Sequence, residues 1–280
     1  MHKFELLNKG SSILKDNSIP SHMLDAELIL SNILNQDREL LLSRGDQLIN
    51  EDQLKKFQRY IKRRSKNEPI AYILNRKEFW KDNFFVDKGV LVPRPETELL
   101  VEEIIRTYLN KSPYILDIGT GSGCIILSIL RDALKAKGVG LDISKKALKI
   151  AKRNAKMLKL DKRVLFINRP KAIKFQRCFD LIVSNPPYIR SSQLRSLPED
   201  IKKYEPTIAL NGGYDGLDVI KKVIYKVSNI LKIKGMFALE IGKGQYLKVS
   251  QILKDKKFRE KKLIKDYRNN IRCIISILDN

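Results

Sequence analysis

Beyond residue 113, short apolar stretches alternate with helical stretches, and this alternation restricts the fold more than any other feature of the chain. Five stretches have the character of strands: 114–118, 138–143, 163–167, 179–184 and 236–241. Helical patterns fill 124–134, 144–158 and 218–231. Strands that alternate with helices form a parallel sheet covered by helices on both faces. The sequence therefore predicts an α/β fold with a doubly wound, mostly parallel, Rossmann-like sheet.

The N-terminal part of the chain lacks this alternation. Apolar residues recur at steps of three and four through residues 24–61, which is typical of helices. Asn50 and Gln53 predict a helix start with reciprocal capping. Residues 71–95 are rich in aromatic and β-branched side chains and contain two turn signals, which favours a β-hairpin. We expect three parts: a helical bundle over 1–70, a hairpin linker over 71–95 and the α/β domain over 96–280.

Composition narrows the cellular setting. No apolar run approaches the roughly 18 residues that cross a bilayer, and the first residues lack the apolar core of a signal peptide, so we expect a cytoplasmic protein. Three widely spaced cysteines without a CxxC pair predict reduced structural thiols and no metal site. The net charge of +23 attracts polyanions, but its lysines are spread along the chain. Contact with RNA therefore stays open.

A glycine-rich loop, Gly119 to Gly123, follows the first predicted strand of the α/β part. Ligands of open α/β sheets bind at the carboxyl ends of strands. A dinucleotide loop would carry a small residue at 124, where Cys124 stands, and this counts against NAD. Asp142 ends the next strand and can accept hydrogen bonds from ribose hydroxyls. A nucleoside without a pyrophosphate fits S-adenosylmethionine. Predicted cofactor-binding residues are Asp117, Gly119, Thr120, Gly121, Ser122, Gly123, Asp142 and Asn185, with Asp117 near the amino-acid end.

The segment Asn185-Pro186-Pro187-Tyr188 follows the fourth predicted strand, and its prolines make it stiff. Methyl transfer from a sulfonium depends mainly on holding a lone pair in line with the methyl group. The Asn185 side-chain oxygen and the Pro186 carbonyl can accept N–H bonds from a planar NH₂ group and stabilise its developing positive charge. Pro187 restrains Pro186, and Tyr188 offers a flat wall. We assign catalysis to Asn185, Pro186 and Tyr188, and target binding to all four residues. Adenine, cytosine, glutamine and asparagine all remain possible targets.

These motifs resemble those of the peptide-chain release factor glutamine methyltransferases, the HemK/PrmC family. The resemblance covers the whole chain and rests on Val92-Pro93-Arg94-Pro95-Glu96-Thr97-Glu98, Asp117 to Gly123, Asn185 to Tyr188, Glu205-Pro206, Gly212 to Leu217 and Glu240-Ile241-Gly242 with Gln245. The Pro-Arg-Pro-Glu-Thr-Glu stretch discriminates best, because many adenine methyltransferases share the Asn-Pro-Pro-Tyr loop but lack it.

The resemblance implies a class I S-adenosylmethionine-dependent methyltransferase fold. It also implies methylation of the side-chain amide of the glutamine in the Gly-Gly-Gln motif of class 1 release factors, and an N-terminal bundle that helps dock this protein substrate. The chain departs from the family near the adenine ring, where Arg169 and Pro170 replace a polar residue and an aromatic one. We assign Pro170 to the cofactor site, with Phe175 or Phe179 as substitutes for the aromatic residue.

Three alternatives compete with this reading. A sister enzyme methylates a glutamine on a ribosomal large-subunit protein with the same chemistry. An adenine methyltransferase acting on nucleic acid would suit the charge, although no target-recognition module is visible in the first 90 residues. A catalytically inactive binding protein on the same fold is the third. We expect a monomer without a membrane partner.

Overall fold

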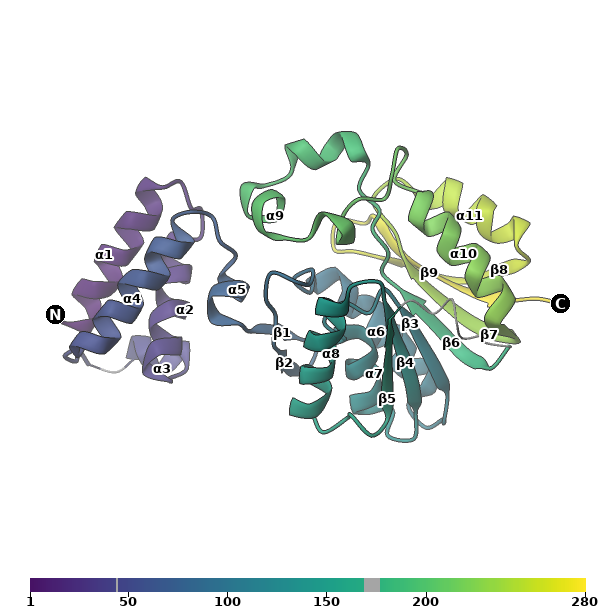
Figure 1. The fold of residues 1–280 in the computed structure, drawn as a ribbon, viewed down its shortest axis with the longest axis horizontal. Coiled ribbons are helices and arrows are strands. Elements are labelled where there is room, and N and C mark those ends of the chain that lie inside the picture. Colours follow the sequence, from purple (N-terminus) through teal and green to yellow (C-terminus); the bar gives the residue numbers. More distant parts are fainter. Residues whose placement is uncertain (44, 169–176) are drawn as a thin grey trace. The chain divides into compact units, whose positions relative to one another are not determined.

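The computed structural model describes residues 1–43, 45–168 and 177–280 (Figure 1). The chain forms two compact units. Unit 1 comprises Met1–Arg76 together with Pro198–Tyr204, and unit 2 comprises Lys77–Leu197 and Glu205–Asn280. The short helix α9 (Glu199–Tyr204) thus belongs to unit 1, where the Tyr204 hydroxyl donates to the carbonyl of Lys66 at 3.0 Å.

Unit 1 is built from helices, as the periodicity of its apolar residues predicts. They are α1 (Lys3–Asp16), α2 (His22–Leu34), α3 (Arg38–Ser43), α4 (Glu51–Arg64) and α5 (Ile70–Leu74). The reciprocal cap expected at the start of α4 is confirmed: Asn50 Oδ1 accepts from the Gln53 N–H at 2.9 Å, and the Asn50 N–H donates to Gln53 Oε1 at 3.1 Å. Leu6, Leu30 and Phe57 are among the side chains of its core.

The hairpin is shorter than the run of aromatic and β-branched residues indicates. Its strands, β1 (Lys77–Phe79) and β2 (Asp82–Phe84), pair in antiparallel fashion. Helix α5 (Ile70–Leu74) instead takes up the first residues of that run. Pro69 precedes this helix with a φ of -55°, and Tyr72 is buried. A proline at a helix start and burial of the apolar side chains outweigh the β-propensity of the segment.

Unit 2 is organised around a seven-stranded sheet in the described part of the chain. Its strands are β3 (Tyr114–Ile118), β4 (Lys137–Asp142), β5 (Val164–Asn168), β6 (Phe179–Ser184), β7 (Leu231–Glu240), β8 (Phe258–Lys265) and β9 (Ile271–Leu278). Their order is β5-β4-β3-β6-β7-β9-β8, and the first five run parallel. β9 runs antiparallel to both neighbours. The doubly wound, mostly parallel sheet is confirmed.

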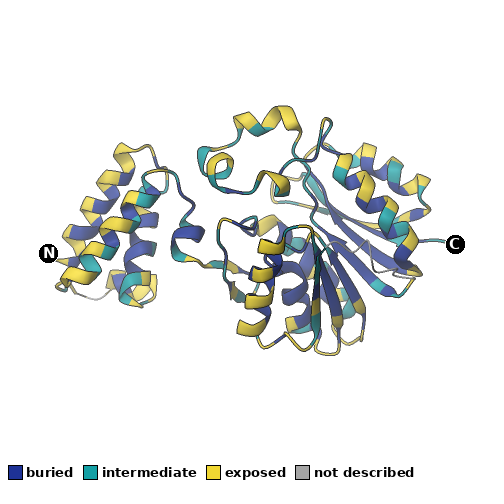
Figure 2. Ribbon diagram, viewed as in Figure 1, coloured by how far each residue is buried: buried dark blue, intermediate teal, exposed yellow. Residues whose placement is uncertain are grey.

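Helices cover both faces of this sheet, and alternate strand residues face each layer. Helices α6 (Glu98–Tyr108), α7 (Cys124–Asp132) and α8 (Lys145–Met157) pack with Ile115 and Leu181. Helices α10 (Asp218–Ile230) and α11 (Tyr246–Asp255) pack with Leu116 and Ile182 on the other face. Figure 2 shows the strands buried and the outer sides of the helices exposed. Short 3₁₀ helices occupy Pro95–Thr97 (η1), Ser191–Ser196 (η3) and Thr207–Ala209 (η4). Within the described residues, no helix has both the length and the apolar character to span a membrane.

The strand order brings two distant loops together. From β3 the chain proceeds outward to β4 and β5, then returns to place β6 on the other side of β3. The last residues of β3 and β6, Ile118 and Ser184, are register partners, and the Ser184 hydroxyl donates to the Ile118 carbonyl at 2.7 Å. The loops that follow these strands therefore lie at the switch point of the sheet, where ligands of such folds bind.

Candidate active site

A cavity of about 420 Å³ lies at this switch point. Six of the residues that the sequence assigns to the site line it: Gly119, Gly121, Asp142, Asn185, Pro186 and Pro187. The remaining lining residues come mainly from the segment before η1, from residues 143–147, from residues 206–211 and from α10. The structure thus brings the glycine loop and the Asn-Pro-Pro-Tyr loop onto one wall.

The glycine loop depends on backbone conformations that side chains disfavour. Gly119, Gly121 and Gly123 have φ values of +78°, +55° and +81°. At Gly119 there is room for a side chain, so conformation alone requires glycine there. At Gly123 a Cβ would also lie 3.1 Å from the side chain of Leu127, because α7 begins close to its neighbours. Thr120 and Ser122, in the same loop, are buried and do not line the cavity.

Asp117 is fully buried under the same loop. Its Oδ2 accepts from the Thr120 hydroxyl at 2.6 Å, and among the described residues nothing donates to its Oδ1. Burial, reinforced by the nearby charge of Asp142, raises the pKa of Asp117 to about 7. A positive charge bound at the loop would favour ionisation of Asp117, which suits its assignment near an amino group.

Asp142 is held with its carboxylate in a defined position at the end of β4. Its Oδ2 accepts from the Gly121 N–H at 2.9 Å, and its Oδ1 accepts from the Ser144 N–H at 2.8 Å. Burial raises its pKa, and these backbone bonds oppose the rise. Each carboxylate oxygen keeps a further lone pair, so both can still accept from ribose hydroxyls.

Asn185 is anchored through its amide nitrogen. Nδ2 donates to the Thr97 hydroxyl at 3.2 Å, and no described residue donates to Oδ1. Nor does any described group donate to the carbonyl of Pro186. Both residues line the cavity. Two acceptors are therefore available there for an NH₂ group.

Tyr188, the last residue of this loop, does not line the cavity. Its hydroxyl accepts from Arg272 at 3.1 Å, and the Arg272 guanidinium lies 5.5 Å from the ring centroid. Burial, reinforced by the negative charge of Glu240, raises the pKa of Tyr188 to about 12. Gln245 donates to the Tyr188 carbonyl at 3.0 Å. These contacts fix the end of the loop, and a contact between the ring and the target stays a prediction.

The apolar part of the cavity supplies residues that sequence reasoning missed. Ile143 follows Asp142 directly and remains 62% exposed, which is unusual for isoleucine at the end of a buried strand. Val219 and Val223 of α10 line the same cavity. The signal available in the sequence was the β-branched residue directly after Asp142, the predicted ribose ligand. These side chains form an apolar surface suited to a nucleobase.

None of the residues that the sequence suggested for adenine binding can be placed in the cavity. Pro170, Arg169 and Phe175 lie outside the described residues. The alternative based on Phe179 is wrong: its ring is fully buried at the start of β6 and stacks on Tyr114 with centroids 4.9 Å apart. That position is at the amino end of the strand, whereas the cavity lies at the carboxyl ends.

The Pro-Arg-Pro-Glu-Thr-Glu stretch is tied to two other segments of unit 2. Arg94 Nη2 donates to Glu205 Oε1 at 2.7 Å, and Glu205 Oε2 accepts from the Val92 N–H at 3.2 Å. Thr97 contacts Asn185 as described above. The stretch therefore binds Asn185 of the cavity lining and Glu205 beside it, and residues 93–98 do not line the cavity themselves.

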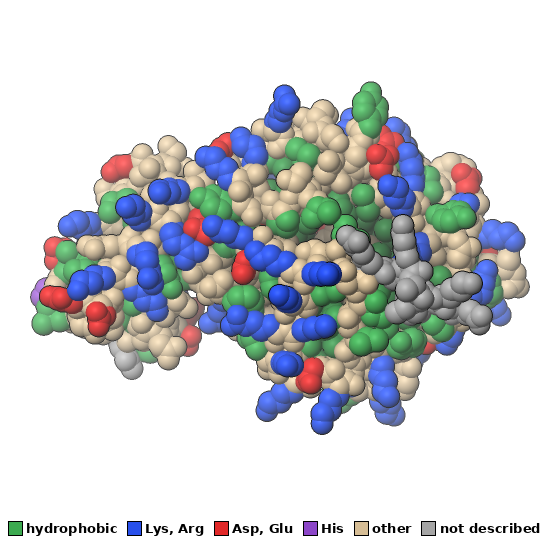
Figure 3. All heavy atoms as spheres, in the orientation of Figure 1, with side chains coloured by type: hydrophobic (Ala, Val, Ile, Leu, Met, Phe, Trp, Pro, Cys, Tyr) green, Lys and Arg blue, Asp and Glu red, His purple; other side chains and the backbone are tan. Residues whose placement is uncertain are grey.

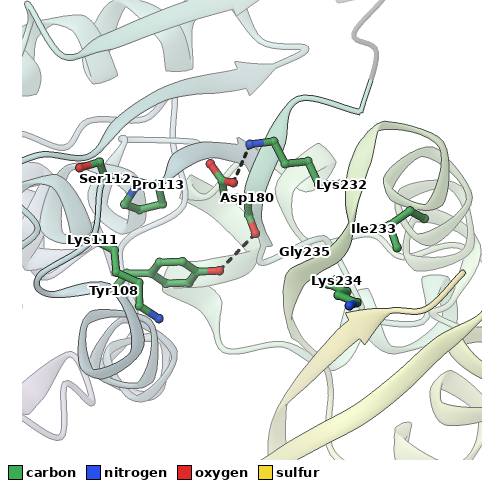
Figure 4. Close-up of a pocket in the computed structure, with 9 residues that line it drawn as sticks. All are labelled: Tyr108, Lys111, Ser112, Pro113, Asp180, Lys232, Ile233, Lys234 and Gly235. Atoms are coloured by element: carbon green, nitrogen blue, oxygen red, sulfur yellow. Dashed lines mark hydrogen bonds and ion pairs between the residues drawn. The ribbon is translucent and has the colours of Figure 1, made fainter.

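A second hollow, of about 300 Å³, differs from the cavity in that several of its polar groups bond to one another (Figure 4). Asp180 lies in it, and its carboxylate pairs with Lys232 at 2.7 Å and accepts from the Tyr114 N–H at 2.8 Å. The Tyr108 hydroxyl donates to the Asp180 carbonyl at 3.2 Å. The polar groups of Asp180, Lys232 and Tyr108 thus bond to one another, which gives this hollow a structural character, in contrast to the cavity with its available acceptors.

Two solved structures illustrate the similarity of the fold to known proteins. The hMettl16 catalytic domain in complex with MAT2A 3′UTR hairpin 6 aligns with a TM-score of 0.55 at 15% identity, covering 70% of this chain and 76% of that one. A methyltransferase from Pyrococcus furiosus aligns with a TM-score of 0.52 at 17% identity, covering 70% and 89%. At these identities the likeness concerns the fold alone. Together with the match of residues 93–199 to the methyltransferase small domain, the fold defines the class: a Rossmann-like, class I S-adenosylmethionine-dependent methyltransferase.

The particular family follows from the sequence comparisons. Residues 5–74 match the PrmC N-terminal domain, and residues 93–199 match the methyltransferase small domain. The release factor glutamine methyltransferase of Clostridium acetobutylicum is 38% identical over 277 residues, covering 98% of this chain and 97% of its own. That of Caulobacter vibrioides is 34% identical over 266 residues, covering 94% and 92%. The chain belongs to the release factor glutamine methyltransferase family, and its cofactor is S-adenosylmethionine.

Proposed function

We propose that this chain transfers a methyl group to the side-chain amide nitrogen of the glutamine in the Gly-Gly-Gln motif of class 1 peptide chain release factors. The observation that carries the proposal is the anchoring of Asn185: its amide nitrogen is engaged by Thr97, which leaves its oxygen available in the cavity next to the Pro186 carbonyl. Two fixed acceptors match the two N–H donors of a primary amide. The names of the relatives support release factors as the substrate.

The residues of the cavity fit the cofactor. When bound, S-adenosylmethionine supplies a methyl group on a positively charged sulfur. Asp142 is placed to accept from the ribose hydroxyls, and Ile143 with Val219 and Val223 offers an apolar surface for the adenine. The glycine loop, with the buried Asp117 beneath it, would face the amino-acid end. We propose this division of the cavity as the binding mode.

The proposed role of the Asn185 loop is to activate a weak nucleophile. The lone pair of an amide nitrogen is delocalised into its carbonyl group. Asn185 Oδ1 and the Pro186 carbonyl, each accepting one N–H bond, favour a pyramidal nitrogen with a localised lone pair, and they stabilise the positive charge that grows on it. The carbon–nitrogen bond forms as the carbon–sulfur bond breaks, sulfur keeps that electron pair, and one proton leaves the nitrogen for water. The products are N-methylated glutamine and S-adenosylhomocysteine.

A nucleic-acid substrate is the second candidate, and the charge distribution favours it. Figure 3 shows Lys and Arg side chains over many parts of the visible face. Helix α8 begins beside the cavity and contains six Lys and Arg residues but no Asp or Glu. Such a face attracts phosphates. The pair of acceptors at Asn185 suits the amino group of adenine as well as it suits an amide.

Transfer of a labelled methyl group tests the proposal. The purified chain is offered a class 1 release factor, the same factor with its Gly-Gly-Gln glutamine changed to alanine, a ribosomal large-subunit protein fraction, and duplex DNA and RNA. We expect label on the intact factor alone. Label on the fraction or on nucleic acid, with none on the factor, would refute the proposed substrate.

A further inference from the structure

A chain of buried polar groups runs from Asn185 into the core of unit 2. Asn185 Nδ2 donates to Thr97 Oγ1 at 3.2 Å, and Thr97 Oγ1 donates to Glu240 Oε2 at 2.7 Å. The Tyr188 hydroxyl oxygen lies 3.5 Å from Glu240 Oε1, and Arg272 Nη2 lies 3.9 Å from the same Glu240 oxygen. Thr97 and Glu240 are 2% and 0% exposed, so the protein rather than bulk water determines these hydrogen bonds.

The Thr97 hydroxyl has a single proton, and this fixes the direction of the chain. An ionised carboxylate can only accept, so Thr97 must donate to Glu240. Its remaining hydrogen-bonding capacity is as an acceptor, which suits the NH₂ group of Asn185 and not the oxygen. The opposite orientation of the amide would set Asn185 Oδ1 against an oxygen with no proton to offer. It would also present an NH₂ group to a target whose own nitrogen carries N–H donors.

We propose that Thr97 is a positioning residue, whose hydroxyl, oriented by Glu240, holds the Asn185 amide with its oxygen toward the cavity. The orientation concerns the free protein and is independent of the target. Its effect on methyl transfer rests on the proposed function. The inference also gives a role to the threonine of the Pro-Arg-Pro-Glu-Thr-Glu stretch, which does not itself line the cavity.

The protonation state of Glu240 determines whether this arrangement is enforced. Burial raises the pKa of Glu240 to about 7, so the carboxyl titrates near neutrality. A protonated Glu240 can donate to Thr97, and the Thr97 hydroxyl can then donate to Asn185 Oδ1. The opposite orientation of the Asn185 amide then becomes possible. The titratable and charged groups around Glu240 are Glu96 on η1, Cys124 at the start of α7, Tyr188 after β6, and Arg272 and Cys273 on β9. Of these, Arg272 favours the ionised form and Glu96 opposes it.

Observation of the Asn185 side-chain amide by NMR tests the orientation without any substrate. The full chain is labelled with ¹⁵N at asparagine, and the Asn185 signal is assigned by its loss in Asn185→Asp. In the wild type at pH 8 we expect slow hydrogen exchange of the NH₂ group, because it is bonded to a buried hydroxyl. Thr97→Val should accelerate that exchange, Thr97→Ser should preserve it, and so should the control Thr107→Val, whose hydroxyl bonds only within α6.

Two results of this experiment would overturn the inference. One is equal exchange in Thr97→Val and the wild type. The other, which needs no folded valine variant, is a wild-type Asn185 signal whose exchange is already as fast as that of an exposed asparagine such as Asn229. Lowering the pH through 7 should alter the Asn185 signal in the wild type but not in Glu240→Gln.

Methyl-transfer kinetics then test the consequence. Misplacement of a reacting group can cost on the order of 100-fold, so we expect kcat of Thr97→Val to fall by about 10- to 100-fold. The Kd for S-adenosylmethionine should change by less than about twofold, which corresponds to roughly 0.4 kcal/mol. Thr97→Ser should recover most of kcat. Failure of the wild type to methylate any release factor would refute the proposed function and leave the NMR result to decide the orientation. An active wild type matched by Thr97→Val would refute the positioning role.

Discussion

Asn154 offers a sharp test of how the glycine loop is held in place. This side chain on α8 is 1% exposed and makes three hydrogen bonds to distant backbone. Nδ2 donates to the Ser122 carbonyl at 2.8 Å and to the Phe85 carbonyl at 3.0 Å, while Oδ1 accepts from the Phe85 N–H at 2.8 Å. One amide thus joins α8, the glycine loop and the segment after the hairpin.

Replacement of Asn154 by alanine removes all three bonds and leaves two carbonyls and one N–H without their partner. At about 1 kcal/mol for each hydrogen bond, the loss in the free energy of unfolding is about 3 kcal/mol. For a unit of about 200 residues this lowers Tm by roughly 6 to 12 °C. Because Ser122 belongs to the glycine loop, the Kd for S-adenosylmethionine should also rise.

Thermal unfolding followed by circular dichroism, with and without S-adenosylmethionine, measures both effects. Asn229→Ala is the matched control, since Asn229 is exposed and bonds only to Tyr225 on its own helix; its Tm should change little. Asn154→Asp keeps the acceptor but sets a carboxylate against two carbonyls, so it should be no more stable than Asn154→Ala. A Tm for Asn154→Ala within 1 °C of the control would refute this account.

Three further changes probe the site. Asn185→Ala removes one of the two acceptors and should lower kcat by about 100-fold with the fold intact, as checked by methyl transfer and circular dichroism; retained turnover would count against the role of the Asn185 oxygen as an acceptor. Asp142→Ala should mainly weaken S-adenosylmethionine binding in calorimetry, and an unchanged Kd would refute the ribose contact. Glu240 has a folded-state pKa of about 7, above the ordinary 4.5, so the folded protein binds its proton more tightly and stability falls as pH rises between these values. Glu240→Gln should therefore show a smaller fall in Tm between about pH 5 and pH 8, whereas an undiminished fall would contradict the raised pKa.

The sequence alone predicted five of the seven described strands of the sheet and six of the residues that line the cavity. The strands at 114–118 and 179–184 occur as expected, because short, mostly apolar runs between turn signals favour buried strands. The C-terminal pair, β8 and β9, was missed. β8 has the sequence FREKKLIK, with mostly polar residues, and lies at the edge of the sheet, where a strand needs few apolar side chains.

Long-range partners escaped sequence reasoning for a different reason. Thr97 and Asn185 are 88 residues apart, and Thr97 and Glu240 are 143 apart. Periodicity and turn chemistry report only on local structure, and they contain no signal for a hydrogen bond between side chains brought together by strand order. For the same reason, nothing in the sequence indicated that residues 198–204 belong to unit 1, whose other residues are 1–76.

These partners account for the arrangement of the Pro-Arg-Pro-Glu-Thr-Glu stretch. Arg94 binds Glu205, which precedes the segment that lines the cavity at 206–209, and Thr97 binds Asn185. Between them, Pro95 restricts the backbone and so limits how far the separation of the two attachments can vary. A substitution of Arg94 or Thr97 should therefore act on catalysis through the residue that each one binds. The kinetic effects of the two substitutions should differ. Loss of Arg94 should displace the cavity wall and raise the Kd for the ligand, whereas loss of the Thr97 hydroxyl should lower kcat at unchanged cofactor affinity.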